Sequence, residues 1–177
     1  LTVKAEIESV VLSWKPVNGG VEYVVFKDNQ ELTTVKKPTY KDKVVAGKSY
    51  AYNVTAIDKS GEKSTRSLTE YGKALFPPPK NIKAKGSKNT INLTWGSVEN
   101  ASAYNIYRDD DLVNTTTETS YSDFKLKYDE DYTYVLVTID HHQEEGSKSN
   151  PIPGKTHKEV KKIKKIKAEA GESIVDL

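Results

Sequence analysis

The chain of 177 residues contains no cysteine and no methionine, and none of its apolar runs is long enough to cross a membrane. Without cysteine, the protein can form neither a disulfide bond nor a thiolate metal site. The absence of methionine even at position 1 indicates a processed chain or a piece of a longer one. No segment has the basic start and apolar stretch of a signal peptide. We therefore expect no insertion into a membrane.

Positive charge is not concentrated in one segment either. The formal net charge of +2 divides into 12 basic and 9 acidic side chains in residues 1–76, 9 and 12 in residues 77–155, and 6 and 4 in residues 156–177. A protein that binds nucleic acid specifically usually gathers its positive charge on one domain or face. We therefore expect no specific nucleic-acid partner.

What the chain does contain is an internal repeat with a shift of 81 residues, which becomes 82 after one inserted residue. The stretch VLSWKPVNGGVEYVVFKDNQ begins at Val11, and NLTWGSVENASAYNIYRDDD begins at Asn92. The matched pairs are Trp14 and Trp95, Tyr23 and Tyr104, Phe26 and Tyr107, Tyr40 and Tyr121, Asp42 and Asp123, Tyr50 and Tyr132, Tyr52 and Tyr134, Val54 and Leu136, and Asp58 and Asp140. The repeat predicts two small domains, in residues 1–76 and 77–155.

The apolar pattern of both copies predicts β-strands. Apolar side chains alternate in residues 10–14 and 91–95, which is typical of a half-buried strand, and four apolar residues share one face of residues 50–56. Polar turns follow at residues 27–30 and 109–111. Short β-segments separated by polar turns, with almost no helical pattern, predict an all-β sandwich in each copy.

Three consecutive prolines, Pro77 to Pro79, separate the two copies. Proline fixes φ and has no backbone donor, so this stretch is expected to be extended, polyproline-like chain that pairs with no strand. We therefore expect a stiff spacer between the two domains.

The C-terminal segment, residues 156–177, allows three interpretations. Val160, Ile163 and Ile166 are spaced by three among lysines, which is typical of a short basic amphipathic helix. The segment also repeats the start of the second copy: residues 166–169 match residues 82–85, and residues 174–177 match residues 90–93. A disordered tail is the third alternative. We favour a linker followed by the truncated start of a third domain.

The order of these motifs resembles the fibronectin type III family, and its bacterial extracellular modules in particular. Leu-x-Trp is followed by Tyr-x-x-Tyr, with Phe26 as the second aromatic of the first copy, then by Tyr-x-Asp and by Gly-x-x-Tyr-x-Tyr-x-Val-x-Ala-x-Asp. The first copy runs on into a Ser-Gly-Glu turn at residues 60–62. The second copy departs from the pattern at residues 128–131, where it has Tyr-Asp-Glu-Asp, so we expect a differently shaped turn before Tyr132.

The resemblance implies two tandem immunoglobulin-like sandwiches and gives structural roles to four aromatic residues. Trp14 and Trp95 would lie in the core between the sheets. Tyr50 and Tyr132 would be tyrosine corners, whose hydroxyl groups bond a crossover loop to the backbone.

Two motifs offer possible metal ligands but lack the required spacing. His141 and His142 are adjacent, so their side chains would point to opposite sides of a strand end, and no third histidine has ligand spacing. Asp109 to Asp111 are consecutive at a turn, whereas calcium loops use spaced oxygen ligands. We interpret both motifs as solvated turns and assign no metal site.

Nothing in the sequence pairs a nucleophile with a general base. The histidines are His141, His142 and His157, and no serine lies in a nucleophile-elbow pattern. The many carboxylates lack an apolar pocket that would raise the pKa of one of them. We therefore expect no enzymatic activity, no catalytic residue and no cofactor.

Surface binding remains open at a few positions. Phe26 and Tyr107 lie on the strand face opposite the repeated tyrosines, where they are either exposed rings that stack on a sugar or a partner, or rings packed across the strands. The loops at residues 59–63 and 141–146 differ in length and charge, which argues against a shared ligand. The glycosylation pattern, which matters only in a secretory host, occurs at Asn53, Asn92, Asn100 and Asn114.

We predict a non-catalytic spacer or presentation segment of a longer modular protein, outside the cell or on a bacterial surface, with neighbouring domains of the same chain as partners. The alternative is a structural subunit of a phage tail or surface filament, hence of a virion, in which residues 158–167 and the strand-like ending pair with a neighbouring subunit. A third hypothesis is weak glycan or protein binding through loops or exposed aromatic rings.

Overall fold

The structure is a computed structural model that describes residues 1–158. All its regular elements are strands, and no helix forms in this part of the chain, so no described helix could cross a membrane. The all-β class predicted from the sequence is confirmed. The predicted start of a third domain within residues 156–177 lies, from residue 159 onward, outside the described residues.

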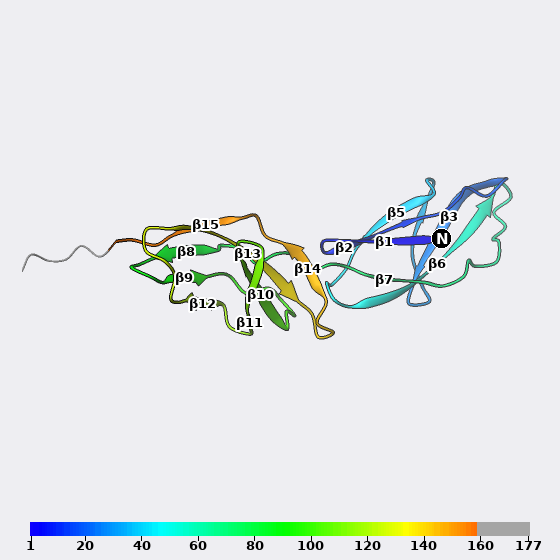
Figure 1. Ribbon diagram of the computed structural model, residues 1–177. Coiled ribbons are helices and arrows are strands. Elements are labelled where there is room, and N and C mark those ends of the chain that lie inside the picture. The colour runs from blue at the N-terminus through cyan, green and yellow to red at the C-terminus, as the bar shows by residue number, and fades with distance from the viewer. Residues whose placement is uncertain (159–177) are drawn as a thin grey trace, which may run out of the picture.

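The first module contains seven strands in two antiparallel sheets (Figure 1). The strands are β1 (Thr2–Glu6), β2 (Ser9–Ser13), β3 (Gly20–Lys27), β4 (Gln30–Val35), β5 (Thr39–Lys43), β6 (Ser49–Asp58) and β7 (Glu70–Lys73). One sheet has the order β1-β2-β5 and the other has the order β4-β3-β6-β7. Val10 and Leu12 of β2 pack in one buried cluster with Tyr50 and Tyr52 of β6, so the two sheets face each other as a sandwich.

The second module repeats this arrangement. Its strands are β8 (Lys83–Gly86), β9 (Ile91–Thr94), β10 (Ala103–Arg108), β11 (Asp111–Thr116), β12 (Ser120–Asp123), β13 (Asp131–Ile139), β14 (Glu145–Lys148) and β15 (Ile152–Lys155). One sheet has the order β12-β9-β8, and the other has the order β11-β10-β13-β14. β15 pairs with the first half of β13 and β14 with the second half, so the two short strands together cover one edge of β13.

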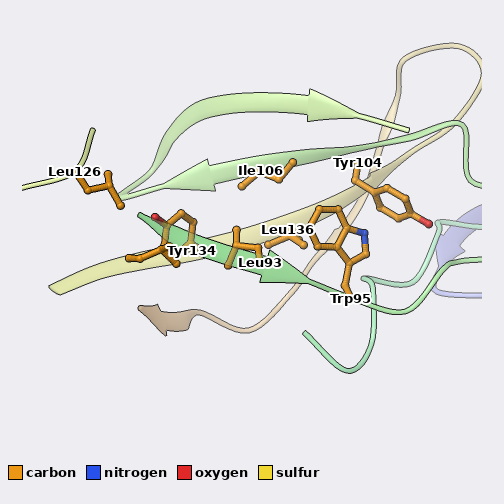
Figure 2. Packing of buried hydrophobic residues seen from close by; sticks show 8 residues of the cluster. Leu93, Trp95, Tyr104, Ile106, Leu126, Tyr134 and Leu136 are labelled. Carbon is orange, nitrogen blue, oxygen red and sulfur yellow. The ribbon is translucent and has the colours of Figure 1, made fainter. Parts of the chain in front are cut away.

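The core of the second module lies between its sheets (Figure 2). Leu93 and Trp95 approach from β9 and the residue that follows it, Ile106 from β10, and Tyr134 and Leu136 from β13. Alternation along each strand places these side chains on the inner face. Complete burial of a large apolar side chain contributes about 1.5–3 kcal/mol, so this cluster is a main source of the module's stability.

The one-residue insertion in the second copy lies at the turn after β12. Leu126 N donates to Asn89 O at 3.0 Å, as Val44 N donates to Glu8 O at 3.1 Å in the first module. Lys125, just before this bond, has a φ of 60°, and this left-handed residue absorbs the insertion.

The next turn has a left-handed residue at the same position in both modules, but its hydrogen bonds differ: Lys48 N donates to Val45 O at 3.4 Å, whereas the matched Glu130 N donates to Thr156 Oγ1 at 3.0 Å. Gly47 has a φ of 75°, and its counterpart Asp129 has a φ of 57°. Aspartate tolerates the left-handed region better than most residues, which explains why the change from glycine keeps the turn.

The two modules lie end to end, and β14 is the strand of the second module that is labelled nearest to the first (Figure 1). Pro77 to Pro79 lie outside every strand, as their sequence predicts. The side chain of Phe76, just before them, is buried. The connector is therefore packed against protein and is not a free loop.

Candidate functional site

A buried carboxylate joins the two sheets of the first module. Tyr52 Oη of β6 donates to Asp42 Oδ2 of β5 at 2.7 Å, and Lys27 Nζ lies 2.9 Å from the same oxygen. Because β5 and β6 belong to different sheets, the hydrogen bond between them ties the sandwich together. The repeat contains all three residues, but sequence reasoning missed their contact and assigned Lys27 to a polar turn.

The second module holds the same cluster with a stronger cation contact. Tyr134 Oη donates to Asp123 Oδ2 at 2.8 Å, and Arg108 Nη1 reaches both carboxylate oxygens, at 3.0 and 2.9 Å. Burial, and then the neighbouring carboxylate, raise the pKa of both Tyr134 and Tyr52 far above the ordinary value. Both phenols therefore stay protonated as structural donors.

A tryptophan packs against a tyrosine in each module, with ring centroids 5.4 Å apart for Trp14 and Tyr23 and 5.6 Å apart for Trp95 and Tyr104. Figure 2 shows the pair of the second module. Both pairs are edge-to-face, a favourable aromatic geometry. Trp95 is 6% exposed, as expected for a core residue, whereas Trp14 is only partly buried. The two modules therefore differ most clearly at this end of the sandwich.

The tyrosine corner is present in the second module only. Tyr132 Oη accepts a hydrogen bond from Lys127 N at 3.0 Å, as predicted. The hydroxyl of Tyr50 makes no such bond within residues 1–158, so its predicted role was wrong. The Tyr50 ring instead lies beneath the ammonium groups of Lys27 and Lys48, 4.2 and 5.2 Å from its centroid.

Neither aromatic candidate for surface binding is a free ring. Phe26 is 7% exposed, because the Arg66 guanidinium covers its face 3.8 Å from the centroid. Tyr107 is half-buried, and its hydroxyl bonds the carboxylate of Glu145. The structure thus favours packing within the sheet over exposed rings. Arg66 is 40 positions from Phe26 in the sequence, so strand alternation alone did not predict their contact.

The aspartates at residues 109–111 form a hairpin turn. Asp109 and Asp110 have φ values of 49° and 72°, like Asp28 and Asn29 in the first module. Asp109 Oδ1 accepts from Thr133 N of β13 at 2.9 Å, so its carboxylate ties the turn to the neighbouring strand. Positive φ at two central residues is typical of a tight type I′ hairpin turn.

His141 and His142 are exposed in the turn after β13, where Asp140 Oδ1 accepts from His142 N at 2.8 Å and from Glu144 N at 2.9 Å. Asp58 forms the same turn with Glu62 in the first module, so the predicted difference in length between these loops was wrong. Within residues 1–158, no three histidine or acidic side chains are grouped as ligands for a metal ion.

The glycosylation pattern at Asn53 is blocked by the fold. Asn53 is 6% exposed, and its amide nitrogen donates to Ser67 O at 3.2 Å and to Thr69 Oγ1 at 2.9 Å. A glycan could not be attached to this nitrogen without opening the sheet edge.

Phe76 contacts both modules at their junction. A Cβ atom on Gly47 would lie 2.7 Å from the Phe76 ring, and a Cβ atom on Gly146 would lie 2.7 Å from its carbonyl oxygen. Phe76 O accepts from Ser147 N at 3.0 Å. Thr138 Oγ1 donates to the next carbonyl, Pro77 O, at 2.8 Å. Phe76 is therefore held from both sides, and each glycine makes room for it.

An ion-pair cluster lies across the same junction. Lys73 at the end of β7 donates to Asp140 Oδ2 of the second module at 2.9 Å and also bonds the Glu144 carboxylate. Hydrogen bonds to Asp140 and Glu144 raise the pKa of Lys73. Burial opposes ionisation of Asp140, but bonds from Lys73 and the backbone N–H groups of Glu144 and His142 outweigh it and lower the pKa of Asp140. Both charges are therefore stabilised where they meet.

A groove lies at the end of the first module away from the junction. This groove, of about 650 Å³, is lined by Leu1, Trp14, Tyr23, Val54, Ala56 and Arg66 among others. It explains the partial exposure of Trp14.

No protein-family model matches the chain. A poly(3-hydroxybutyrate) depolymerase of Ralstonia pickettii is 28% identical over 89 residues, which is 50% of this chain but only 18% of the length of that protein. Among solved structures, a family 28 exopolygalacturonase of Yersinia enterocolitica matches with a TM-score of 0.44 and 13% identity, over 47% of this chain and 21% of the other. The central fibronectin-III array of RIM-binding protein matches with a TM-score of 0.38 and 15% identity, over 98% and 74% of the two chains.

The strand order identifies the type of β-sandwich. In each module the first, second and fifth strands form one sheet, and the fourth, third and sixth strands, with one or two edge strands, form the other. The repeated tryptophan and tyrosines lie between these sheets, as the family pattern requires. Residues 1–158 therefore form two tandem β-sandwiches with the fold of fibronectin type III modules.

Proposed function

We propose that the chain is a non-catalytic spacer that holds other domains of a longer, extracellular or cell-surface bacterial protein at a fixed separation. The observation that carries this proposal is the packed junction. Phe76 is buried between Gly47 and Gly146, and Lys73 pairs with Asp140 across the same boundary. A linker that is bonded to the next module cannot swing as a flexible chain of the same length would.

Similarity to the Ralstonia pickettii depolymerase supports a place within a longer protein, because the matched stretch is a small part of that enzyme. The three buried acidic side chains of the described residues are also engaged in structural contacts: Asp42 with Tyr52, Asp123 with Tyr134, and Asp140 with Lys73. This arrangement favours a structural role over acid–base catalysis. Nothing in the comparisons supports the virion alternative.

The experiment measures the distance between the modules. The chain has no cysteine, so Lys59→Cys and Lys85→Cys, both at exposed positions, provide two unique sites for spin labels. We expect a single narrow distance distribution by double electron–electron resonance. Phe76→Ala should broaden it, because the ring that both modules contact is removed. The matched control is Phe124→Ala, at a phenylalanine that is 65% exposed, and it should leave the distribution narrow.

A broad distribution in the otherwise unchanged chain would contradict a stiff spacer. So would a distribution that stays equally narrow after Phe76→Ala, because the junction would then not set the separation.

A further inference from the structure

The turn before β3 contains the one asparagine of the sequence that is followed by glycine. Asn18 and Gly19 take its two central positions, and Gly20 N donates to Val17 O at 3.0 Å to close it. Gly19 has a φ of 79°, which the second central position of a type II turn requires and which glycine adopts readily. Both central residues are exposed. The asparagine–glycine pair therefore lies at the surface, in a turn that a backbone hydrogen bond closes.

Neither of the two groups that react in an asparagine–glycine pair is engaged here. Within residues 1–158, the side-chain amide of Asn18 makes no hydrogen bond, and Gly19 N has no acceptor. A Cβ atom added to Gly19 would meet no atom within 4 Å beyond its chain neighbours. Glycine also leaves the backbone rotation at this position unhindered. The Asn18 side chain can therefore turn back onto Gly19 N without displacing a packed group.

We propose that Asn18 is a site of spontaneous deamidation, which converts the neutral turn of the first module into an acidic one. Gly19 N gives up its proton to a solvent base and attacks Cγ of Asn18. A new C–N bond forms, the bond from Cγ to the side-chain nitrogen breaks, and ammonia leaves with a proton. Water then opens the resulting succinimide ring at either of its carbonyl groups, which gives aspartate or isoaspartate. The net reaction consumes one water molecule, releases one ammonia molecule and involves no oxidant or reductant.

The matched turn of the second module lacks these conditions. There Ala101 N donates to Val98 O at 3.2 Å, which is the bond that closes the turn. The asparagine of this turn, Asn100, takes the second central position, so the nitrogen that would attack its side chain is the bonded one of Ala101. The methyl group of Ala101 also crowds the approach. Asn100 is exposed like Asn18, and it provides an internal comparison that should keep its amide.

The second module also shows that the fold accepts a carboxylate at this place. The repeat matches Asn18 with Glu99, which is exposed in the same turn. An aspartate at position 18 is therefore compatible with the turn. Because residues 1–76 carry 12 basic and 9 acidic side chains, one added carboxylate lowers their net charge from +3 to +2.

The isoaspartate product changes the backbone as well as the charge. Its main chain passes through the former side chain, which adds an atom between Val17 and Gly20, so the bond from Gly20 N to Val17 O no longer fits. The turn is anchored through Val17, whose N–H donates to Tyr23 Oη at 3.1 Å, and the Tyr23 ring packs edge-to-face against Trp14. Trp14 should therefore report the opening of the turn. None of these residues contacts the junction, so the spacer function does not depend on this reaction.

The test incubates the full chain in warm, mildly alkaline buffer and follows each asparagine by peptide mass spectrometry. Electron-transfer fragmentation distinguishes aspartate from isoaspartate. We expect Asn18 to lose its amide about tenfold faster than Asn100, which corresponds to a barrier lower by about 1.4 kcal/mol. The rate at Asn18 should rise with pH, because the attacking nitrogen must lose its proton.

Two variants at this exposed position separate the reaction from its consequence for the fold. Asn18→Gln keeps a side-chain amide but would have to close a larger ring, so it should stay unchanged during the incubation. Asn18→Asp supplies the aspartate product directly and should leave the Trp14 resonance in place in ¹⁹F NMR of 5-fluorotryptophan. The isoaspartate fraction of the incubated chain should shift that resonance and leave the Trp95 resonance unmoved.

Retention of the Asn18 amide for as long as that of Asn100 would overturn the proposal. The same mass change in the peptide of the Asn18→Gln variant would overturn it as well, because the reaction would then lie at another residue. An unmoved Trp14 resonance in a chain rich in isoaspartate would overturn the predicted opening of the turn.

Discussion

The two modules have the same sheets and the same buried polar cluster, but more hydrogen bonds hold the cluster and the tyrosine corner in the second module. Asp123 receives two hydrogen bonds from Arg108, whereas Asp42 has one contact with Lys27. The hydroxyl of Tyr132 ties down a loop, and its counterpart Tyr50 does not. The difference teaches that the repeat preserves which side chains are buried, while the completeness of their bonding depends on residues at the module ends.

The largest expected effect comes from removing the charge at the centre of the cluster. We expect Asp42→Asn and Asp123→Asn each to lower the free energy of unfolding of its own module by about 3–5 kcal/mol, the usual cost of breaking a buried ion pair from one side. The second module should lose more, because Arg108 then loses both its counter-charge and one of the two oxygens that accept its hydrogen bonds. Each module has one tryptophan, so urea unfolding followed by ¹⁹F NMR of 5-fluorotryptophan measures the two changes separately.

Asp110→Asn is the matched control, since Asp110 lies at an exposed turn where asparagine is equally suitable. An equal or larger loss for Asp42→Asn would show that the two-bond arginine contact adds nothing to the second module.

The matched turns at Gly47 and Asp129 sharpen the comparison at the junction. Gly47→Ala places a Cβ atom in the left-handed region and 2.7 Å from the Phe76 ring. We expect a loss of about 2–4 kcal/mol from strain and overpacking together. Asp129→Ala should cost about 1 kcal/mol, because that position already accommodates a side chain.

Differential scanning calorimetry and the two tryptophan signals distinguish these outcomes. If Gly47→Ala lowered the free energy of unfolding only slightly, Phe76 would have other places to pack. The junction would then not depend on this glycine.

Removal of the tyrosine-corner hydroxyl should have a smaller effect on stability. We expect Tyr132→Phe to lower the free energy of unfolding by about 0.5–1.5 kcal/mol, because the bond from Lys127 N is lost. Tyr50→Phe should be nearly neutral, since the Tyr50 hydroxyl makes no bond to the described backbone. Urea midpoints of the two single variants, compared with that of the unaltered chain, measure this contrast. A loss of the same size for both variants would contradict the assignment of the corner to one module.

Much of the fold could be predicted from the sequence because strand alternation and repeat spacing are local signals. Trp95 and the residues on one face of β6 were correctly assigned to the core. The contact between Asp42 and Tyr52 was missed, because it joins two sheets and no local period reports which strands face each other. The sequence signal for this contact was the common shift of 81 residues that relates Lys27 to Arg108 and Asp42 to Asp123.

The junction could not be predicted for a different reason. Three prolines indicate an extended connector, but they do not indicate what the neighbouring Phe76 touches. Gly47 and Gly146 are 99 positions apart, and their common role in making room for Phe76 becomes apparent only when the modules are placed together.

The smallest expected effect concerns the ion pairs that Lys73 makes across the junction. Lys73 has a raised pKa, so its contribution is complete below the ordinary value of 10.5 and is lost as the pH rises through the folded-state pKa. Asp140 has a lowered pKa, so its contribution is complete above the ordinary value of 3.8 and is lost as the pH falls through the folded-state pKa. The junction should therefore be tightest between these limits.

At pH 7, Lys73→Met should broaden the spin-label distance distribution less than Phe76→Ala does, because a partly exposed ion pair contributes only about 0.2–1 kcal/mol. Lowering the pH through the folded-state pKa of Asp140 should broaden the distribution of the unaltered chain and change that of the Lys73→Met variant little. Lys63→Met is the matched control, because Lys63 pairs with Glu31 at 3.6 Å entirely within the first module. The tryptophan signals establish that both modules stay folded in acid. Identical acid responses with and without Lys73 would assign the loosening to other carboxylates and leave Phe76 as the main constraint on the junction.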